Sequence, residues 1–229
     1  MGTRWRLSGW WTVASGKREA RKKFFDGVDL YPVIGERFCG GRPALEILEG
    51  VIQGGAKIVQ LREKELPLRD VFARAEQFRE VTSREGVLLV INDRVDIALA
   101  VDADGVHLGQ EDLSLTAARR IAPDLLIGVS SHSLEEALAA RDGGADYVNV
   151  GPIFPTNTKE GLVRPLGPGA VNRIGERAGI PFTVMGGIKE ENISEVISRG
   201  ARRVAVVTAV TEAGDVLKST RSLVDRIRR

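Results

Sequence analysis

The sequence predicts the α/β class and, within it, a (β/α)8 TIM barrel built as a single domain with an N-terminal extension. Eight short apolar runs alternate with amphipathic segments along the 229 residues. Most of these runs are rich in Val and Ile without polar alternation, which is typical of parallel strands buried on both faces. Glycines stand after the helical segments, where a left-handed residue commonly ends a helix. The length is slightly below the roughly 250 residues that are usual for this fold.

The expected elements alternate strictly from residue 30 onward. The apolar runs, expected as strands, cover residues 30–34, 58–61, 87–91, 105–108, 125–129, 147–150, 181–185 and 204–207. The amphipathic segments, expected as helices, cover residues 44–53, 68–80, 95–101, 116–121, 134–141, 170–178, 191–198 and 216–227. In the second of these helices, Val71, Ala75 and Phe78 share one face, and we expect that face to cover the barrel.

Charge divides the chain into two parts. Residues 1–25 carry seven basic residues and one acidic residue, so the rest of the chain has a net charge of −4 within a total of +2. We therefore separate a basic extension, residues 1–28, for which a helix is one interpretation, from a catalytic barrel domain, residues 29–229. A slightly acidic body argues against a nucleic-acid partner, which requires a basic face. The extension is a poor match to a signal peptide.

Composition excludes several other classes of protein. Cys39 is the single cysteine, which excludes an internal disulfide framework and a cysteine-based zinc or iron–sulfur site. No apolar run approaches the roughly 18–20 residues of a membrane span, so we expect no membrane partner. These observations favour a cytoplasmic protein that acts on small molecules, and a homo-oligomer stays open.

In this fold the loops after the strands build the active site. The second expected strand leads into Gln60-Leu61-Arg62-Glu63-Lys64. Alternation along a strand sends Gln60, Arg62 and Lys64 to the same side, toward the barrel interior or its mouth. Because burying unpaired charge is costly, the two cations there predict an anionic ligand. The alternative is that they pair with loop acids such as Glu63.

Two carboxylates follow the next two expected strands. Asn92 and Asp93 come after the third strand and Asp112 after the fourth. Neighbouring strands present both aspartates to one rim, where oxygen ligands beside a phosphorylated substrate suit Mg²⁺. The alternative is that each aspartate caps a helix. His107 lies inside an apolar run, which favours a packed, hydrogen-bonded core histidine.

Ser130-Ser131-His132 follows the fifth expected strand. Adjacent strand residues point to opposite faces, and no G-x-S-x-G motif is present, so a serine hydrolase is disfavoured. We expect Ser130 to donate a hydrogen bond to an anionic ligand.

The loop after the sixth expected strand carries Thr156, Asn157, Thr158 and Lys159 between prolines and glycine. Hydroxyls and an ammonium on such a loop suit an anion clamp, and ordinary turn chemistry is the alternative for the threonines.

The last two expected strands lead into a second candidate anion site. Gly186-Gly187 follows the seventh strand, and Val207-Thr208 follows the eighth. Loops at these positions usually bind phosphate in barrels, because glycine lets backbone N–H groups approach the anion. The sequence therefore predicts two anion pockets, one assisted by a metal ion and one built from backbone.

Taken in order, these residues resemble the thiamine phosphate synthase family over residues 31–210. The segments that carry the resemblance are GGAKIVQLREKE (54–65), INDRVDIALAVDADGVHLGQEDL (91–113), IGVSSHSLEEAL (127–138), DYVNVGPIFPTNTKEG (146–161) and MGGIKEEN (185–192). The resemblance implies an enzyme that joins 4-amino-2-methyl-5-(diphosphooxymethyl)pyrimidine to 4-methyl-5-(2-phosphooxyethyl)thiazole, or its carboxylated form. The products are thiamine phosphate and pyrophosphate.

The resemblance also implies residue roles. Substrate contacts fall on Gln60, Leu61, Arg62, Glu63, Lys64, Asn92, Ser130, Thr156, Asn157, Thr158, Lys159, Gly187, Val207 and Thr208. Among these, the catalytic groups would be Arg62, Lys64, Ser130 and Lys159. Asp93 and Asp112 would bind the cofactor Mg²⁺.

The chain departs from the family pattern at a few positions. Thr208 stands where serine is usual, Met185 replaces an aliphatic residue, and Arg202-Arg203 replaces Asp-Gly. We expect Arg203 to alter packing beside the phosphate loop. Two alternative functions stay open: a thiazole tautomerase-like barrel, and a non-catalytic barrel that binds a phosphorylated metabolite.

We expect Lys159→Ala to slow the chemical step by more than about tenfold, because one cation facing the leaving diphosphate is lost. Single-turnover pyrophosphate release measures this rate, and circular dichroism checks that the variant is folded. An unchanged single-turnover rate would contradict the role.

Overall fold

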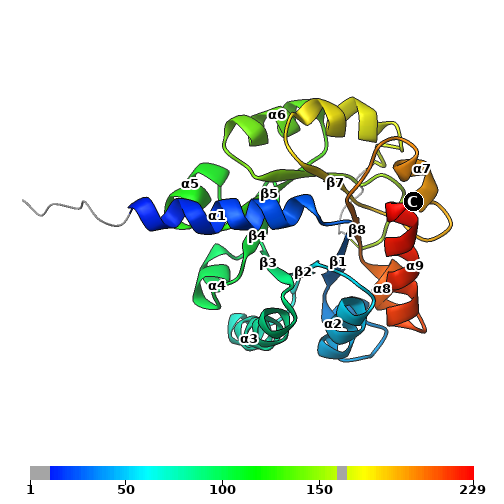
Figure 1. Cartoon of the computed structure of the whole chain (residues 1–229), viewed down its shortest axis with the longest axis horizontal. Helices are drawn as coiled ribbons and strands as arrows, with labels where there is room; N and C mark the ends of the chain where they lie inside the picture. Colours follow the sequence, from blue (N-terminus) through cyan, green and yellow to red (C-terminus); the bar gives the residue numbers. More distant parts are fainter. Residues whose placement is uncertain (1–10, 159–163) are drawn as a thin grey trace, which may run out of the picture.

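The computed structural model describes residues 11–158 and 164–229, and its strands close into one parallel barrel in chain order (Figure 1). The predicted (β/α)8 fold is therefore confirmed. The strands are β1 (Leu30–Ile34), β2 (Ile58–Leu61), β3 (Leu88–Asn92), β4 (Gly105–Leu108), β5 (Leu126–Ser131), β6 (Tyr147–Val150), β7 (Phe182–Val184) and β8 (Val204–Val206). Each strand pairs in parallel with its neighbours, and β1 closes the ring against β8.

Helices surround the barrel at every segment that periodicity predicts except residues 170–178, and one further short helix, Thr208–Thr211, was not predicted. They are α2 (Ala44–Gln53), α3 (Leu68–Glu85), α4 (Val95–Ala100), α5 (Leu115–Ile121), α6 (Leu134–Asp142), α7 (Ile193–Ile197), α8 (Thr208–Thr211) and α9 (Val216–Arg228). A short 3-10 turn, η1 (Glu36–Phe38), precedes α2, and helix α1 (Trp11–Asp26) precedes the barrel. Among the described residues, none of the helices has both the length and the apolar character that a bilayer span requires.

One expected helix has a different form. Instead of an α-helix over residues 170–178, the chain forms a π-type turn, η2 (Val171–Gly175), and a 3-10 turn, η3 (Glu176–Ala178). Gly175 lies within this segment, and glycine is a poor helix former. A side chain here would meet the ring of Phe182 about 2.5 Å away, so the close packing against β7 requires glycine.

The barrel interior is packed around a buried tyrosine. Tyr147 projects inward from β6, and its ring fills the space that a side chain on Gly128 of β5 would need. Tyr31, Val90 and Leu126 belong to the same interior cluster, while a separate apolar layer lies between strands and helices. The interior of this barrel is thus a core rather than a channel, as is usual for the fold.

Helix α1 covers the amino-terminal end of the barrel (Figure 1). Phe25, near the end of α1, is buried and stacks on Tyr147 with ring centroids 4.5 Å apart. Arg203 precedes β8, lies with its guanidinium 5.3 Å from the Phe25 ring, and donates to the carbonyls of Phe25 and Asp26. The expectation that Arg203 lies beside the phosphate loop is wrong, because residues before a strand belong to the opposite end of the barrel.

A buried and a partly buried aspartate fasten α1 to this end. Asp146, just before β6, pairs with Arg18 of α1 at 2.8 Å and with Arg119 at 2.6 Å. Asp104, just before β4, pairs with Arg21 of α1 at 3.2 Å. Each carboxylate also accepts a hydrogen bond from a strand N–H, so each is held by backbone as well as by arginine. The extension is therefore a packed part of the structure from at least residue 18.

Replacing the buried Phe25 should destabilise the fold, whereas replacing its exposed neighbour should not. We expect Phe25→Ala to lower the free energy of unfolding by about 3–5 kcal/mol, because a buried aromatic ring is lost. Phe24 is 41% exposed, and its replacement by Ala should change stability by no more than about 0.5 kcal/mol. Urea unfolding of both variants measures the difference, and equal effects would contradict the described packing of α1.

Candidate active site

Residues 60–64, at the end of β2 and directly after it, alternate between the mouth and the helical layer. Gln60 is buried inside the barrel, whereas Leu61 belongs to the apolar layer outside it. Lys64 forms an ion pair with Asp93 at 2.9 Å. Glu63 instead pairs with Arg74 of α3 at 2.9 Å, so its carboxylate faces the helices. Lys64 therefore does pair with a loop acid, as the alternative expected, but that acid is Asp93 and not Glu63.

The two predicted metal ligands lie together. Asp93 follows β3 with a left-handed backbone, φ 62°, which Asp tolerates better than most residues. Its N–H donates to the carbonyl of His107 on β4 at 2.8 Å, which ties the ends of the two strands together. Burial raises the pKa of Asp93, the adjacent carboxyl group of Asp112 raises it further, and Lys64 partly offsets both effects. A second cation at this pair would relieve the same repulsion.

Helix capping does not account for these aspartates. Helix α4 begins after Arg94 without a side-chain cap, and the cap of α5 is Ser114, whose hydroxyl accepts from Ala117 N. Asp112 accepts instead from the Gly109 backbone at 2.6 Å, within the turn that follows β4. Both carboxylates therefore belong to the rim and not to the helices.

A chain of hydrogen bonds crosses the interior beneath the mouth. Gln60 Nε2 donates to Tyr31 Oη at 3.0 Å, and Tyr31 Oη lies 3.1 Å from Tyr147 Oη. Tyr147 Oη lies 3.2 Å from His107 Nδ1, and His107 Nε2 lies 3.0 Å from Ser130 Oγ. His107 is thus a buried, hydrogen-bonded core histidine, as the sequence predicts. Burial raises the pKa of both tyrosines, so they remain protonated.

Ser130, near the end of β5, has a histidine partner that the sequence does not indicate. Ser130 points inward to His107, whereas Ser131 is fully buried on the other face of the strand. His132 directs its backbone N–H to Glu136 at 2.7 Å. Alternation correctly places Ser130 and Ser131 on opposite faces, but it gives no sign of the pairing of Ser130 with His107 across the β4–β5 ladder.

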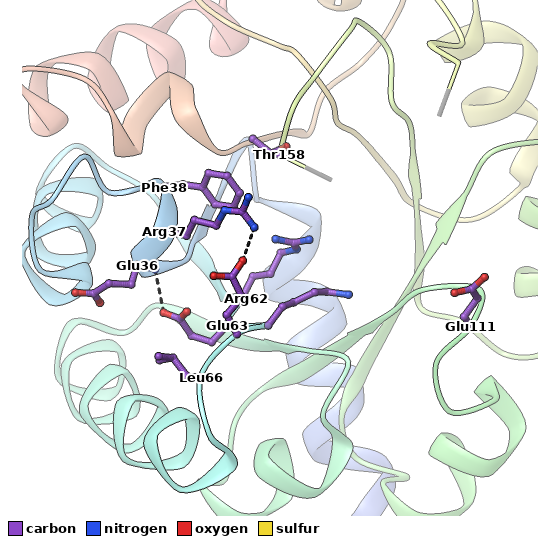
Figure 2. A pocket seen from close by; sticks show the side chains of 10 residues that line it. Glu36, Arg37, Phe38, Arg62, Glu63, Leu66, Glu111 and Thr158 are labelled. Atoms are coloured by element: carbon purple, nitrogen blue, oxygen red, sulfur yellow. Dashed lines mark hydrogen bonds and ion pairs between the residues drawn. The ribbon is translucent and has the colours of Figure 1, made fainter. Parts of the chain in front are cut away.

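Two cavities open beside these residues. The larger, of about 620 Å³, is lined on the β2 side by Arg62 and Lys64 and across the mouth by Glu111 and Thr158 (Figure 2). The smaller, of about 20 Å³, lies between the loops after β7 and β8. Thr158 lines both cavities, so the two predicted anion pockets are neighbours.

The smaller cavity gathers most of the residues of the second predicted pocket. Its lining includes Thr156, Thr158, Gly187, Val207 and Thr208. The hydroxyls of Thr156 and Thr158 lie 3.0 Å apart. Gly187 has φ 61°, and a side chain there would meet the carbonyl of a neighbouring loop residue. This close approach of two backbones requires glycine.

Three other predicted site residues lie in different surroundings or outside the described part of the chain. Asn92 places a buried Nδ2 at the end of β3, and this atom has no hydrogen-bond partner in the described part of the chain. Asn157 is exposed on the loop after β6. Lys159 lies outside the described residues.

Sequence reasoning missed the two tyrosines of the interior chain. Tyr31 shares its strand face with Val33, and Tyr147 shares its face with Asn149. The period-two alternation that assigned Gln60 to the interior also applies to both tyrosines. That signal could have found them.

A closed (β/α)8 barrel with cations, a carboxylate pair and a glycine-bearing loop on one rim defines a barrel enzyme whose site lies at the carboxyl ends of its strands. A family model described as thiamine monophosphate synthase matches residues 30–210. The chain belongs to this family.

Similar proteins carry consistent names. The chain is 45% identical over 195 residues to the thiamine-phosphate synthase of Shouchella clausii, covering 85% of this chain and 93% of that protein. It is also 45% identical to the thiamine-phosphate synthase of Chloroflexus aurantiacus, covering 85% and 90%. A solved thiamine phosphate pyrophosphorylase from Pyrococcus furiosus superposes with a TM-score of 0.82 at 39% identity, covering 91% of this chain and 98% of that one.

Two glycines with the same φ of 61° test the packing at the smaller cavity. Gly187→Ala should destabilise the protein by about 1–3 kcal/mol more than Gly40→Ala, because the new methyl group at 187 meets backbone atoms. At Gly40 nothing lies within 4 Å, so only left-handed strain of about 1–2 kcal/mol remains. Thermal unfolding compares the variants, and equal losses would contradict the close approach.

Proposed function

We propose that the protein is a thiamine phosphate synthase that couples 4-amino-2-methyl-5-(diphosphooxymethyl)pyrimidine to 4-methyl-5-(2-phosphooxyethyl)thiazole, or its carboxylated form. The observation that carries the proposal is the convergence of Lys64, Asp93 and Asp112 on one rim. Family membership supports the same reaction. The products are thiamine phosphate and pyrophosphate.

The diphosphate end of the pyrimidine substrate belongs beside β2 to β5. Arg62 and Lys64 supply cations at the larger cavity, and the buried Nδ2 of Asn92 supplies a donor. Ser130 supplies a hydroxyl at the end of the interior chain. Lys159, from the loop after β6, is proposed as a further cation. Charge-assisted hydrogen bonds of this kind are stronger than neutral ones.

The carboxylate pair fits Mg²⁺. Asp93 and Asp112 offer only oxygen ligands, and the raised pKa of Asp93 reflects two carboxyl groups held close together. Within residues 11–158 and 164–229 no third His, Cys, Asp or Glu completes a metal cluster, so the remaining ligands would be water and substrate oxygens. When bound, Mg²⁺ supplies Lewis-acid neutralisation of charge on the diphosphate oxygens.

The chain's own residues lower the barrier by stabilising the leaving group. The bond between the pyrimidine methylene carbon and the diphosphate oxygen breaks, and both electrons leave with pyrophosphate. Arg62, Lys64 and Ser130 stabilise the negative charge that develops there. The carbocation is stabilised by the pyrimidine ring and its amino group, and the thiazole nitrogen donates its lone pair to form the new C–N bond. No general base is required.

The smaller cavity positions the nucleophile. The thiazole phosphate is assigned to the backbone of Gly187, Val207 and Thr208, with Thr156 and Thr158 beside it. Thr158 lines both cavities, which supports a bound thiazole close to the pyrimidine methylene. Such proximity contributes up to about 7–11 kcal/mol in ideal cases.

Pyrophosphate release from the two mixed substrates with Mg²⁺ tests the proposal. Release that depends on both substrates supports it. Binding of the thiazole phosphate without release would favour the non-catalytic barrel, and activity that survives chelation of Mg²⁺ would favour the tautomerase-like barrel.

The metal assignment makes its own prediction. Asp93→Asn keeps a residue type that tolerates φ 62°, so the fold should persist while a carboxylate ligand is lost. We expect the Mg²⁺ concentration for half-maximal rate to rise by about tenfold or more. Asp142→Asn on the outer helix α6, where the side chain is 67% exposed, is the matched control and should leave this concentration unchanged. An unchanged Mg²⁺ requirement in the Asp93 variant would contradict the assignment.

A further inference from the structure

The interior hydrogen-bond chain joins two residues of the proposed substrate site. It begins at Gln60 on β2 and ends at Ser130 on β5, and it passes through Tyr31, Tyr147 and His107. Gln60, Tyr31, Tyr147 and His107 are each at most 5% exposed. Buried polar groups of this kind are costly unless every one is hydrogen-bonded, and an apolar core would avoid that cost.

The amide at one end gives the chain a direction. An amide nitrogen can only donate, so the oxygen of Tyr31 accepts from Gln60. Tyr31 keeps its own hydroxyl proton, which we assign to the contact with Tyr147, and the Tyr147 proton is assigned in turn to His107 Nδ1. With Nδ1 as acceptor, a neutral imidazole carries its proton on Nε2 and donates to Ser130 Oγ.

We propose that His107, held by Tyr147, is a positioning residue that makes the Ser130 hydroxyl a donor toward the mouth. Because Ser130 Oγ accepts from His107 Nε2, its own proton is directed to an anionic oxygen of the ligand. This inference rests on the proposed function, in which that oxygen belongs to the diphosphate. His107 acts through Ser130 and does not touch the substrate.

The reverse direction has the opposite consequence. If Tyr147 accepted from His107 Nδ1–H, then Nε2 would accept the proton of Ser130. Ser130 would then present only lone pairs to the mouth, and these repel a diphosphate. The tautomer of one imidazole therefore decides whether Ser130 binds an anion.

The tautomer can be measured without activity. The sequence contains two histidines, so the imidazole nitrogen resonances of His107 and His132 are resolved and assigned by comparison with His107→Gln. We expect long-range ¹H–¹⁵N spectra of the free protein to show His107 neutral, with its proton on Nε2. A proton on Nδ1 would overturn the proposal, whether or not the enzyme makes thiamine phosphate.

Single-turnover pyrophosphate release tests the route through Ser130. We expect His107→Leu and Ser130→Ala each to slow the reaction by about tenfold or more, the loss typical of one hydrogen bond to a charged group. The double variant should be no slower than Ser130→Ala alone, because both changes remove the same contact. His107→Gln keeps a donor near the Nε2 position and should restore most of the rate. Losses that multiply in the double variant would overturn the proposal.

Controls separate this inference from the proposed function. His132→Gln, which changes the other histidine, should leave the rate and the His107 tautomer unchanged. If His107→Leu does not fold, Tyr147→Phe keeps the ring that stacks on Phe25 and removes only the hydroxyl that faces Nδ1. We expect this variant to lose the strict Nε2–H tautomer, and retention of that tautomer would count against the relay. A wild-type enzyme that releases no pyrophosphate would instead refute the proposed function.

Discussion

Closure of a parallel ladder is the constraint on which the site depends. When β1 pairs with both β2 and β8, every strand must end at the same rim. Residues far apart in sequence, such as Lys64, Asp93 and Asp112, then become neighbours without any contact specifying each pair separately. The bond from the Asp93 N–H to the β4 backbone refines this arrangement by turning the chain sharply as it leaves β3. The charge density of the mouth is thus a product of topology.

The two ends of the barrel use charge differently. At the amino-terminal end, buried aspartates such as Asp146 meet arginines at 2.6–2.8 Å and backbone N–H groups, so charge is neutralised within the fold. At the carboxyl end, Asp93 pairs with Lys64 but also lies beside the carboxyl group of Asp112, and the pKa of Asp93 is raised. Carboxylates that are paired within the protein stabilise the fold, whereas a carboxylate pair with excess negative charge can bind a cationic ligand.

The elements and the rim were predictable because both follow from local patterns. Buried parallel strands read as apolar runs, and alternation assigns Gln60 inward and Leu61 outward. The irregular segment at residues 170–178 was not predictable from local patterns, because its form depends on how Gly175 packs against Phe182. Alternation could have placed Tyr31 and Tyr147 inside the barrel, but not their hydrogen bond to each other, because they are 116 residues apart. Arg203 and helix α1, read separately as a departure and an extension, turn out to be partners.

The Phe25 ring covers the amino-terminal end of the barrel interior. The interior hydrogen-bond chain reaches the mouth at Ser130, at the opposite end of the barrel from Phe25. In the proposed function, the substrate binds at this mouth and covers Ser130. In the proposed relay, a bound substrate would shield the hydroxyls of this hydrogen-bond chain and the His107 imidazole from bulk water for as long as it stays in place.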